Sequence, residues 1–287
     1  MSYQLLALDI DGTIVTNDLA IHPEVVAAIA AAQARGVRVT LATGRMYGST
    51  LPYANRLNIR DPLICYQGGM IRDPLTHEIY AHTTMPGDLA AEAVELLSQA
   101  GIFVIAYVDE QMCVAYRAPE LETYLRWHPE GIEVVVAPDL AAHSAANPPT
   151  KLLFTAPAEV VEREMLQLAA HFGDRLAVIR SHAIFGELTA PGISKGAALK
   201  DLAARLGIPR GQVMAIGDHE NDLPMITWAG LGLAMGNAIP AVREAADAVI
   251  PSVEEGGVAW AIEQYLLADQ RPTPGLSAVE GTNDQGG

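Results

Sequence analysis

The sequence contains little cysteine. Its 287 residues include only two, Cys65 and Cys113, and each lies within an apolar stretch. Two thiols in a chain of this length form neither a disulfide framework nor a cysteine-based zinc site. We therefore expect both to be small packed core residues, in a protein that works in a reducing compartment such as the cytoplasm.

Positive charge is also scarce. The chain has 18 lysines and arginines against 34 aspartates and glutamates, which gives a formal net charge of -16. Nucleic acids and anionic membrane surfaces are bound through patches of lysine and arginine, so this balance argues against both partners. A small anionic substrate is compatible with the charge only if a metal ion or a few local cations reverse the field at its site.

Long hydrophobic runs are missing as well. No stretch approaches the roughly 18 consecutive apolar residues of a membrane-spanning helix. The amino terminus enters an apolar, strand-like run directly, without the charged leader and apolar core of an export signal. The sequence therefore predicts a cytoplasmic protein without membrane segments.

Half of the residues are hydrophobic, and the length suits one large or two ordinary domains. The chain is organised around residues 5–13, which read Leu-Leu-Ala-Leu-Asp-Ile-Asp-Gly-Thr. Short aliphatic residues in such a run predict a strand that is buried on both faces, as in the middle of a parallel sheet.

Two carboxylates stand at the end of this predicted strand. Because side chains of an extended segment repeat with a period of two, Asp9 and Asp11 point to the same side, and Gly12 allows a sharp turn. Two negative groups this close repel each other unless a cation lies between them. The alternative is an ordinary solvated turn, since Asp and Gly are common in turns. Whether other strands bring matching chemistry to this edge decides between the two.

Strands and helices alternate in both terminal parts of the chain, which is typical of an α/β protein with a doubly wound, mainly parallel sheet. Further strands are expected at residues 37–42, 62–66, 213–216, 230–235 and 248–250, and helices at 22–35, 51–57, 197–206, 223–229, 241–246 and 257–267.

The middle of the chain has a different pattern, with paired strands that indicate an inserted α+β domain. Strands are expected at 102–108, 112–116, 132–137, 151–155, 176–180 and 184–188, helices at 88–99, 119–127 and 158–172, and an irregular stretch at 141–149. We place a discontinuous core domain at residues 1–83 and 187–268 and the inserted domain at 84–186. The tail at 269–287 lacks apolar periodicity and is predicted to be disordered.

Polar residues follow several of the predicted core strands, and a ligand of a doubly wound sheet lies outside these carboxyl ends. Carboxylate oxygens suit Mg²⁺ better than zinc, and a threonine hydroxyl, a glycine N–H and a lysine can neutralise a phosphoryl group. The pattern thus predicts a metal site beside a phosphate site, formed by Asp9, Asp11, Thr43, Gly44, Lys195, Asp218, Asn221 and Asp222.

Several of these residues have a simpler alternative role. Thr43 could cap the helix that follows it, Gly44 could serve only as a turn, and Asn221 with Asp222 could cap the next short helix. Lys195 at a helix start is unfavourable for the helix dipole, which favours a functional role. Arg45 is predicted to be a structural or solvated cation, and His219 a surface imidazole.

Taken together, these motifs resemble the haloacid dehalogenase-type phosphohydrolases, and within them the Cof-like phosphatases, which carry a large α/β cap inserted after the third strand. The resemblance covers residues 3–267. Gln67 stands where relatives usually have Asn, and His219 where a smaller or different residue is common, which bears on the fine contacts of the substrate. The matching motifs occur in the family's order: Asp9-Ile10-Asp11-Gly12-Thr13, Thr43-Gly44-Arg45, Ser194-Lys195-Gly196, Gly217-Asp218-His219-Glu220-Asn221-Asp222 and Ala234-Met235-Gly236-Asn237-Ala238.

The resemblance implies a role for each motif residue. Asp9 would be the nucleophile that forms an aspartyl-phosphate, and Asp11 the general acid and base. Mg²⁺ would be held by the carboxylates of Asp9 and Asp218 and the carbonyl of Asp11, with Asp222 orienting these groups from behind. The phosphoryl oxygens would be bound by Thr43, Gly44, Lys195, Asn221 and the N–H of Ile10.

The inserted domain is expected to close over this edge and to supply substrate contacts. Its candidates are Tyr107, the hairpin tip 109–111, Tyr116 and His182, although tyrosines in strands usually serve packing.

The leading functional hypothesis is a Mg²⁺-dependent phosphomonoester hydrolase that acts on a small phosphorylated metabolite, such as a sugar phosphate or a nucleotide-type cofactor. A phosphohexomutase or a dedicated disaccharide-phosphate phosphatase on the same core is the alternative. A non-catalytic phosphate sensor would be expected to lack Asp9 or Asp11, and both are present. A dinucleotide-binding oxidoreductase is disfavoured, because residues 230–232 lack the order of strand, glycines and helix.

Overall fold

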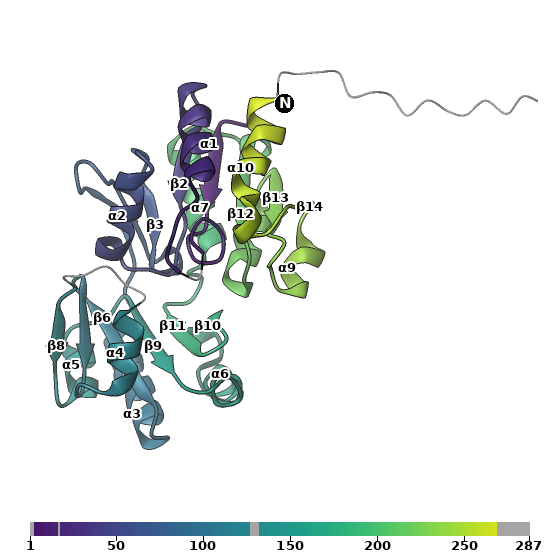
Figure 1. Cartoon of the computed structure of the whole chain (residues 1–287). Coiled ribbons are helices and arrows are strands. Elements are labelled where there is room, and N and C mark those ends of the chain that lie inside the picture. Colours follow the sequence, from purple (N-terminus) through teal and green to yellow (C-terminus); the bar gives the residue numbers. More distant parts are fainter. Residues whose placement is uncertain (1–2, 17, 127–131, 269–287) are drawn as a thin grey trace, which may run out of the picture.

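The computed structural model describes residues 3–16, 18–126 and 132–268. The chain forms two bodies, one above the other in Figure 1, with the middle of the sequence in the lower one. The upper body is built on a parallel sheet and the lower one on a mostly antiparallel sheet. The predicted fold class, a doubly wound core with an inserted α+β domain, is confirmed.

The core sheet has five parallel strands in the order β14-β13-β12-β1-β2. Strand β1 lies between β2 and β12 and is completely buried, as its aliphatic sequence predicts. The bounds are β1 Leu5–Leu8, β2 Arg38–Leu41, β12 Val213–Gly217, β13 Leu231–Ala234 and β14 Ala248–Val249. This order brings the carboxyl ends of β1 and β12 side by side.

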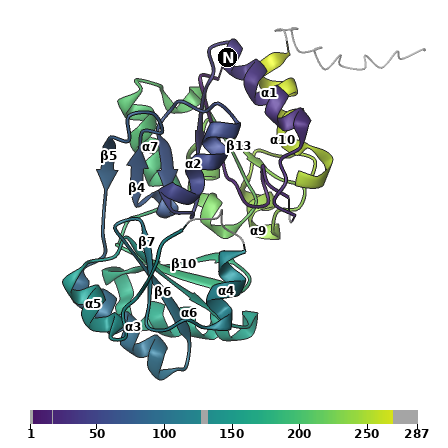
Figure 2. The ribbon, with the colours of Figure 1, turned by 60° about the vertical axis from the view of Figure 1, so that its left-hand side comes forward.

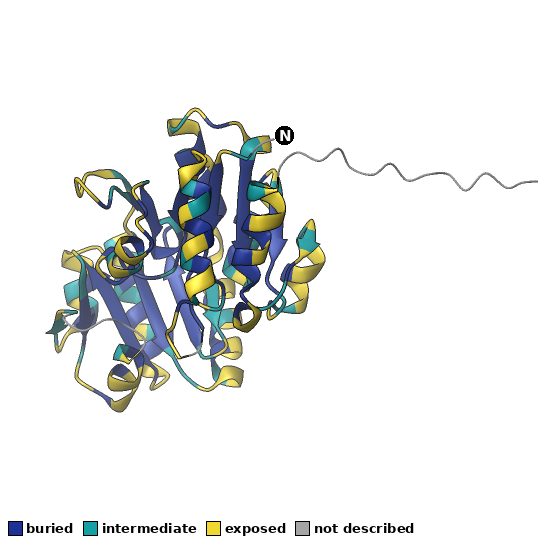
Figure 3. Ribbon diagram, turned by 45° about the horizontal axis from the view of Figure 1, so that its top comes forward, coloured by how far each residue is buried: buried dark blue, intermediate teal, exposed yellow. Residues whose placement is uncertain are grey.

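Helices cover both faces of the core sheet (Figures 1 and 2). α1 (Pro23–Ala34) lies beside α10 (Gly257–Ile262) and the turn Glu263–Leu267 on one face. On the other face α7 (Lys195–Arg205) packs against α8 (Leu223–Trp228), with α9 (Pro240–Ala245) beyond it. Exposed residues line the outer sides of α1 and α10 in Figure 3, whereas the strands between the layers are buried.

After β2 the chain forms α2 (Tyr47–Arg56) and then leaves the main sheet. β3 (Leu63–Cys65) lies beside β2, but in the described structure it pairs with the parallel sheet only at a single bridge between Ala42 and Ile64. It pairs antiparallel with β4 (Met70–Arg72), which pairs with β5 (Ile79–His82) in a separate three-stranded sheet. The sequence did not predict β4 and β5, because strands this short give little alternation of apolar and polar residues.

The second sheet has six strands in the order β10-β11-β9-β6-β7-β8, antiparallel except for β7 and β8. Its strands are β6 Phe103–Val108, β7 Gln111–Val114, β8 Val134–Val136, β9 Lys151–Thr155, β10 Ala177–His182 and β11 Phe185–Thr189. We call this sheet, together with the helices that pack on it, the cap.

Helices α3 (Gly87–Gln99), α5 (Leu140–Ala146) and α6 (Ala158–Phe172) pack on one face of the cap sheet, and α4 (Pro119–Leu125) belongs to the other face. The prediction of an irregular stretch at 141–149 is wrong, because α5 occupies most of these residues. Its alanine-rich sequence lacks a clear apolar stripe, but Asp139 caps it by accepting a hydrogen bond from the N–H of Ala142 at 2.9 Å.

The hairpin between β6 and β7 turns more tightly than expected. Asp109 and Glu110 both have positive φ angles, 47° and 64°, as the central residues of the favoured two-residue hairpin turn require. Gln111 therefore already belongs to β7.

The domain boundaries stay a prediction, and we note that β11 continues past residue 186 to Thr189. The predicted tail 269–287 and the last residue of the expected helix 119–127 lie outside the described residues. Cys65 and Cys113 are free and buried, as predicted. No helix in the described ranges has both the length and the hydropathy that a membrane crossing requires.

Candidate active site

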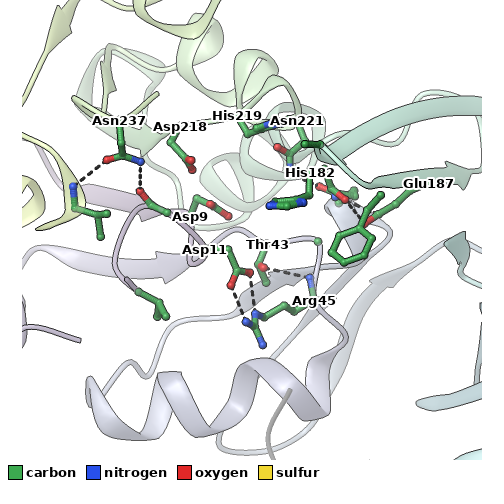
Figure 4. A pocket seen from close by; sticks show the side chains of 18 of the residues that line it. Asp9, Asp11, Thr43, Arg45, His182, Glu187, Asp218, His219, Asn221 and Asn237 are labelled. Atoms are coloured by element: carbon green, nitrogen blue, oxygen red, sulfur yellow. Dashed lines mark hydrogen bonds and ion pairs between the residues drawn. The ribbon is translucent and has the colours of Figure 1, made fainter. Parts of the chain in front are cut away.

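The acidic residues predicted from distant segments meet at the carboxyl ends of the two central strands. Asp9 follows β1 and Asp218 follows β12, and these strands are paired in register (Figure 4). Carboxylate oxygens of Asp9, Asp218 and Asp222 lie within 4.8 Å of one another. Three negative side chains from two loops thus surround one small space.

Lys195 connects two of these carboxylates from the start of α7. Its Nζ donates to Asp9 Oδ1 at 2.6 Å and to Asp222 Oδ1 at 2.7 Å, and all three side chains are buried. The other oxygen of Asp222 accepts the backbone N–H groups of Asp218 and His219 at 2.9 and 3.0 Å. Asp222 therefore fixes both the lysine and the loop that carries Asp218.

The charges in this cluster are not balanced. Burial raises the pKa of Asp9 from its ordinary 3.8 to about 7, the Asp222 charge adds to the effect, and Lys195 opposes it. Burial and the Asp9 charge also raise the pKa of Asp218 well above its usual range. Burial lowers the pKa of Lys195, but the charges of Asp222 and Asp9 outweigh burial, so the net shift is upward. One ammonium is therefore too little positive charge for two buried carboxylates and a third that is partly buried.

The surroundings fit a hard divalent cation. The three grouped ligand atoms are carboxylate oxygens, which suit Mg²⁺ rather than a metal that prefers nitrogen or sulfur. Gly12, at φ +79°, leaves room for the cluster, because a Cβ there would lie 2.4 Å from Asp218 Oδ2. Asn237 holds this loop by donating from Nδ2 to the Gly12 carbonyl at 2.8 Å. Thr13 donates to Asp218 Oδ1 at 3.2 Å.

Asp11 lies apart from the carboxylate cluster and is held by Arg45. The guanidinium donates from Nε to Oδ2 at 2.8 Å and from Nη2 to Oδ1 at 2.6 Å, a two-point contact that fixes the orientation of the carboxylate. Arg45 is only 6% exposed. Of the two roles expected from the sequence, it therefore has the structural one and is not a solvated cation.

The predicted phosphate-binding residues lie on the neighbouring loops. Thr43 is buried, and its Oγ1 accepts the N–H of Arg45 at 3.1 Å. Gly44 packs tightly against Gln67, whose Nε2 would be 2.4 Å from a Cβ at position 44. Asn221 donates from Nδ2 to Gln67 Oε1 at 3.0 Å. The carbonyl of Ile10 accepts three N–H groups from residues 13–15, which orders the first loop.

These loops form the floor of a cavity of about 730 Å³ between the core and the cap. Aromatic and polar side chains together line it on the side of the cap. Phe185 and Tyr124 meet edge to face with ring centroids 5.3 Å apart, and His182 lies 5.3 Å from Phe185. Other lining residues include Asp9, Asp11, Thr43, Gly44, Arg45, Gln67, Lys151, Leu153, Ser181, Glu187, Asp218, His219, Asn221 and Asn237.

The cap candidates differ in position. His182 lines the cavity. Glu110 instead binds the core by accepting from the hydroxyl of Tyr66 at 2.8 Å and the N–H of Gly48 at 2.9 Å. Tyr107 is buried, with its hydroxyl 2.6 Å from that of Tyr124, and Tyr116 is 59% exposed.

Sequence reasoning missed Lys151, Glu187 and the bridging role of Gln67. Lys151 begins β9 and Glu187 lies in the middle of β11, and the two buried side chains form an ion pair at 3.0 Å. A charged residue in the middle of a buried strand is unusual, and this signal was available from the sequence. It could not show which two strands face each other.

A doubly wound core with buried carboxylates and a lysine at its strand ends, covered by an inserted α+β cap, defines a capped α/β phosphohydrolase. The particular family follows from comparison with known proteins. The model of the haloacid dehalogenase-like hydrolases matches residues 6–262, so the chain belongs to this family.

Individual relatives agree over nearly the whole chain. YxeH of Bacillus subtilis, named "Putative phosphatase YxeH", is 33% identical over 93% of this chain and 99% of its own. The HMP-PP phosphatase of Serratia proteamaculans is 30% identical over 92% of this chain and 96% of its own. A haloacid dehalogenase-like hydrolase from Bacteroides thetaiotaomicron, of known structure, superposes with a TM-score of 0.81 at 28% identity, over 92% of this chain and 99% of the other. The predicted family and the class of enzyme, a phosphoric monoester hydrolase, are confirmed.

Proposed function

We propose that the protein is a Mg²⁺-dependent phosphatase of small phosphorylated metabolites that works through an aspartyl-phosphate on Asp9. The observation that carries the proposal is the contact of Lys195 with Asp9 and Asp222 beside Asp218. This group combines a fixed carboxylate, a cation for phosphoryl oxygens and an oxygen-rich place for a metal.

In the first step an oxygen of Asp9 attacks phosphorus, and the bond from phosphorus to the leaving oxygen breaks. Lys195 binds Oδ1 of Asp9 and so fixes the orientation of the nucleophile. Holding the carboxylate in place removes much of the entropic barrier, a contribution of up to roughly 7 to 11 kcal/mol in well-aligned cases.

Asp11 is proposed to give a proton to the leaving oxygen. In the second step its carboxylate takes a proton from the water that attacks the aspartyl-phosphate, which releases inorganic phosphate and restores Asp9. Both carboxylate oxygens of Asp11 accept from Arg45 at the cavity wall, and this charged contact favours the carboxylate form that the second step requires.

The phosphoryl oxygens are assigned to the hydroxyl of Thr43, the N–H groups of Ile10 and Gly44, the amide of Asn221 and the ammonium of Lys195. Mg²⁺, when bound by Asp9, Asp218 and the Asp11 carbonyl, supplies positive charge next to the transferred group. Asp222 holds Lys195 and the Asp218 loop in place.

The cavity above this site has room for a small organic leaving group. The name of the Serratia relative, an HMP-PP phosphatase, supports a small phosphorylated metabolite as the substrate. A cofactor-type phosphate and a sugar phosphate are the two classes that we propose. A mutase on the same core is the second candidate, and it would return an isomeric phosphate ester without free phosphate.

A panel of phosphorylated metabolites tests the proposal by phosphate release with Mg²⁺ and with a chelator. We expect release that requires the metal and that falls by at least about a hundredfold in Asp9→Asn, since the nucleophile is lost. Asp201→Asn is the matched control, because Asp201 pairs only with Arg205 on the exposed side of α7 in the described structure. Activity that survives Asp9→Asn, or that ignores the chelator, would rule out the mechanism.

A further inference from the structure

The cap contains a buried ion pair that the mechanism above does not use. Lys151 of β9 and Glu187 of β11 lie 3.0 Å apart and are 1% and 2% exposed. Burial lowers the pKa of Lys151, and the Glu187 charge opposes this shift and favours the ammonium form. Because desolvation offsets most of the attraction, a buried pair by itself contributes little to stability. The other contacts of Lys151 and Glu187 therefore indicate what the pair does.

Lys151 reaches across to the core. Its Nζ donates to the carbonyl oxygen of Gly44 at 2.7 Å, so a cap cation binds the loop that is proposed to hold phosphate. Glycine allows many orientations of the peptide that follows it. A short hydrogen bond from a charged donor selects one of them.

The peptide group that joins Gly44 to Arg45 also contacts Thr43. The N–H of this group, which belongs to Arg45, donates to Thr43 Oγ1 at 3.1 Å. With a lone pair of Oγ1 occupied in this way, the hydroxyl proton is directed to another acceptor, and Thr43 lines the cavity. The Lys151 charge also polarises the Gly44 carbonyl, which strengthens the N–H at the other end of the peptide as a donor.

Glu187 continues the network in the other direction. Its Oε2 accepts from Nε2 of Gln67 at 3.1 Å, and Oε1 of Gln67 accepts from Nδ2 of Asn221 at 3.0 Å. Gln67 is 1% exposed, and its backbone N–H donates to the Thr43 carbonyl at 3.0 Å. One of the two amide protons of Asn221 is thereby committed, which sets the direction of the other.

We propose that Lys151 and Glu187 are positioning residues that orient Thr43 and Asn221, so that the phosphate site of the core is complete only with the cap in place. This inference rests on the proposed function. Lys151 acts on Thr43 through the Gly44 peptide, and Glu187 acts on Asn221 through Gln67.

The test uses Lys151→Met and Glu187→Gln in the full chain, with acetyl phosphate as a substrate whose leaving group is too small to depend on cap contacts. Each variant is expected to lower kcat/KM for acetyl phosphate and to weaken inhibition by inorganic phosphate, both by about tenfold, as for the loss of a buried charged hydrogen bond. Thr189→Val is the control. Thr189 is buried in β11 opposite Lys151, and its hydroxyl bonds only to the Ala190 carbonyl in the described structure.

Two outcomes would overturn the inference. Losses confined to bulky substrates would make the pair a leaving-group contact, and a lower melting temperature with unchanged kinetics and phosphate inhibition would make it merely structural. If a single variant fails to fold, Lys151→Met combined with Glu187→Met replaces the pair by apolar side chains and is expected to show the same weakened inhibition.

A measurement of phosphate binding distinguishes a failure of this inference from a failure of the proposed function. Calorimetric titration of the wild type and the variants with inorganic phosphate requires no turnover. If the wild type hydrolyses nothing but binds phosphate about tenfold more tightly than the variants, the proposed function fails and the positioning role stands. Equal affinities contradict the positioning role whatever the activity.

Discussion

At the scale of single residues, the acidic cluster depends on a glycine. Gly12 has φ +79°, and a Cβ at this position would lie 2.4 Å from Asp218 Oδ2 and 2.9 Å from its Cγ. Any side chain here must displace the carboxylate that is proposed to bind Mg²⁺. Asn237 also fixes this turn through the Gly12 carbonyl, so the loop has little freedom to adapt.

Gly12→Ala is therefore expected to weaken Mg²⁺ binding at least about tenfold, as judged from the size of one lost charged ligand contact. Gly36→Ala is the matched control, because Gly36 has φ +83° and no atom within 4 Å of an added Cβ. Both variants carry the backbone strain of a left-handed alanine, about 1 kcal/mol. Titration calorimetry and urea unfolding compare them, and equal Mg²⁺ affinities would contradict the steric argument.

The raised pKa of Asp9 makes the effect of Mg²⁺ on stability depend on pH. Between the ordinary value of 3.8 and about 7, the folded chain keeps a proton that the unfolded chain has lost. The free energy of unfolding therefore falls as pH rises through this window. A bound cation replaces the proton and restores the lost stability.

We accordingly expect millimolar Mg²⁺ to raise the melting temperature little near about pH 5 and more near about pH 8. Differential scanning fluorimetry at both values measures the difference. In Asp9→Asn the side chain at position 9 cannot titrate, so the rise in melting temperature with Mg²⁺ should vary less with pH than in the wild type. The variation that remains comes from Asp218. A gain in the wild type that is the same at both pH values would contradict the shift.

At the scale of secondary-structure elements, α2 contains an internal defect. Pro52 lies in the sixth position of this ten-residue helix and has no N–H to donate to the carbonyl of Gly48. Its ring also crowds the preceding turn. Pro52 is exposed, so no packing compensates for the lost hydrogen bond.

Pro52→Ala is expected to raise the free energy of unfolding by about 1 to 3 kcal/mol, the range set by the helix penalty and the added freedom of the unfolded chain. Pro23→Ala provides the comparison, because Pro23 is also exposed but begins α1, where proline is favourable. Urea denaturation measures both. No gain for Pro52→Ala, or an equal gain for Pro23→Ala, would mean that the helix position does not determine the effect.

At the scale of the whole molecule, the two bodies share one hydrophobic interior. A continuous cluster of buried side chains contains Leu8 and Ile64 of the core together with Ile105, Tyr107 and Leu153 of the cap. A second cluster lies only within the cap, between its sheet and helices α3, α5 and α6. Separating the bodies would expose the first cluster and the Lys151 to Gly44 contact.

We therefore expect the protein to unfold in a single cooperative transition, although its core and cap are built on different sheets. Differential scanning calorimetry tests this by comparing the calorimetric with the van't Hoff enthalpy, which should agree for a two-state transition. Two separate transitions would show that the shared cluster couples the bodies weakly.

Much of this organisation could be read from local patterns. The aliphatic run before Asp9 predicted the central strand, and the polar residues after the core strands predicted which side chains meet. Elements with weak patterns were harder. β4 and β5 are too short to show alternation, and α5 is alanine-rich, so both were missed.

The sequence by itself determined which end of the core carries the acidic cluster, because strand periodicity and parallel order bring the carboxyl ends of the strands to one edge wherever the loops lead. Only the tertiary structure decided how the cap joins it. The contacts of Lys151 with Gly44 and of Glu187 with Gln67 link residues 107 and 120 positions apart. Such pairings depend on how two sheets face each other, and no local preference of the chain encodes that arrangement.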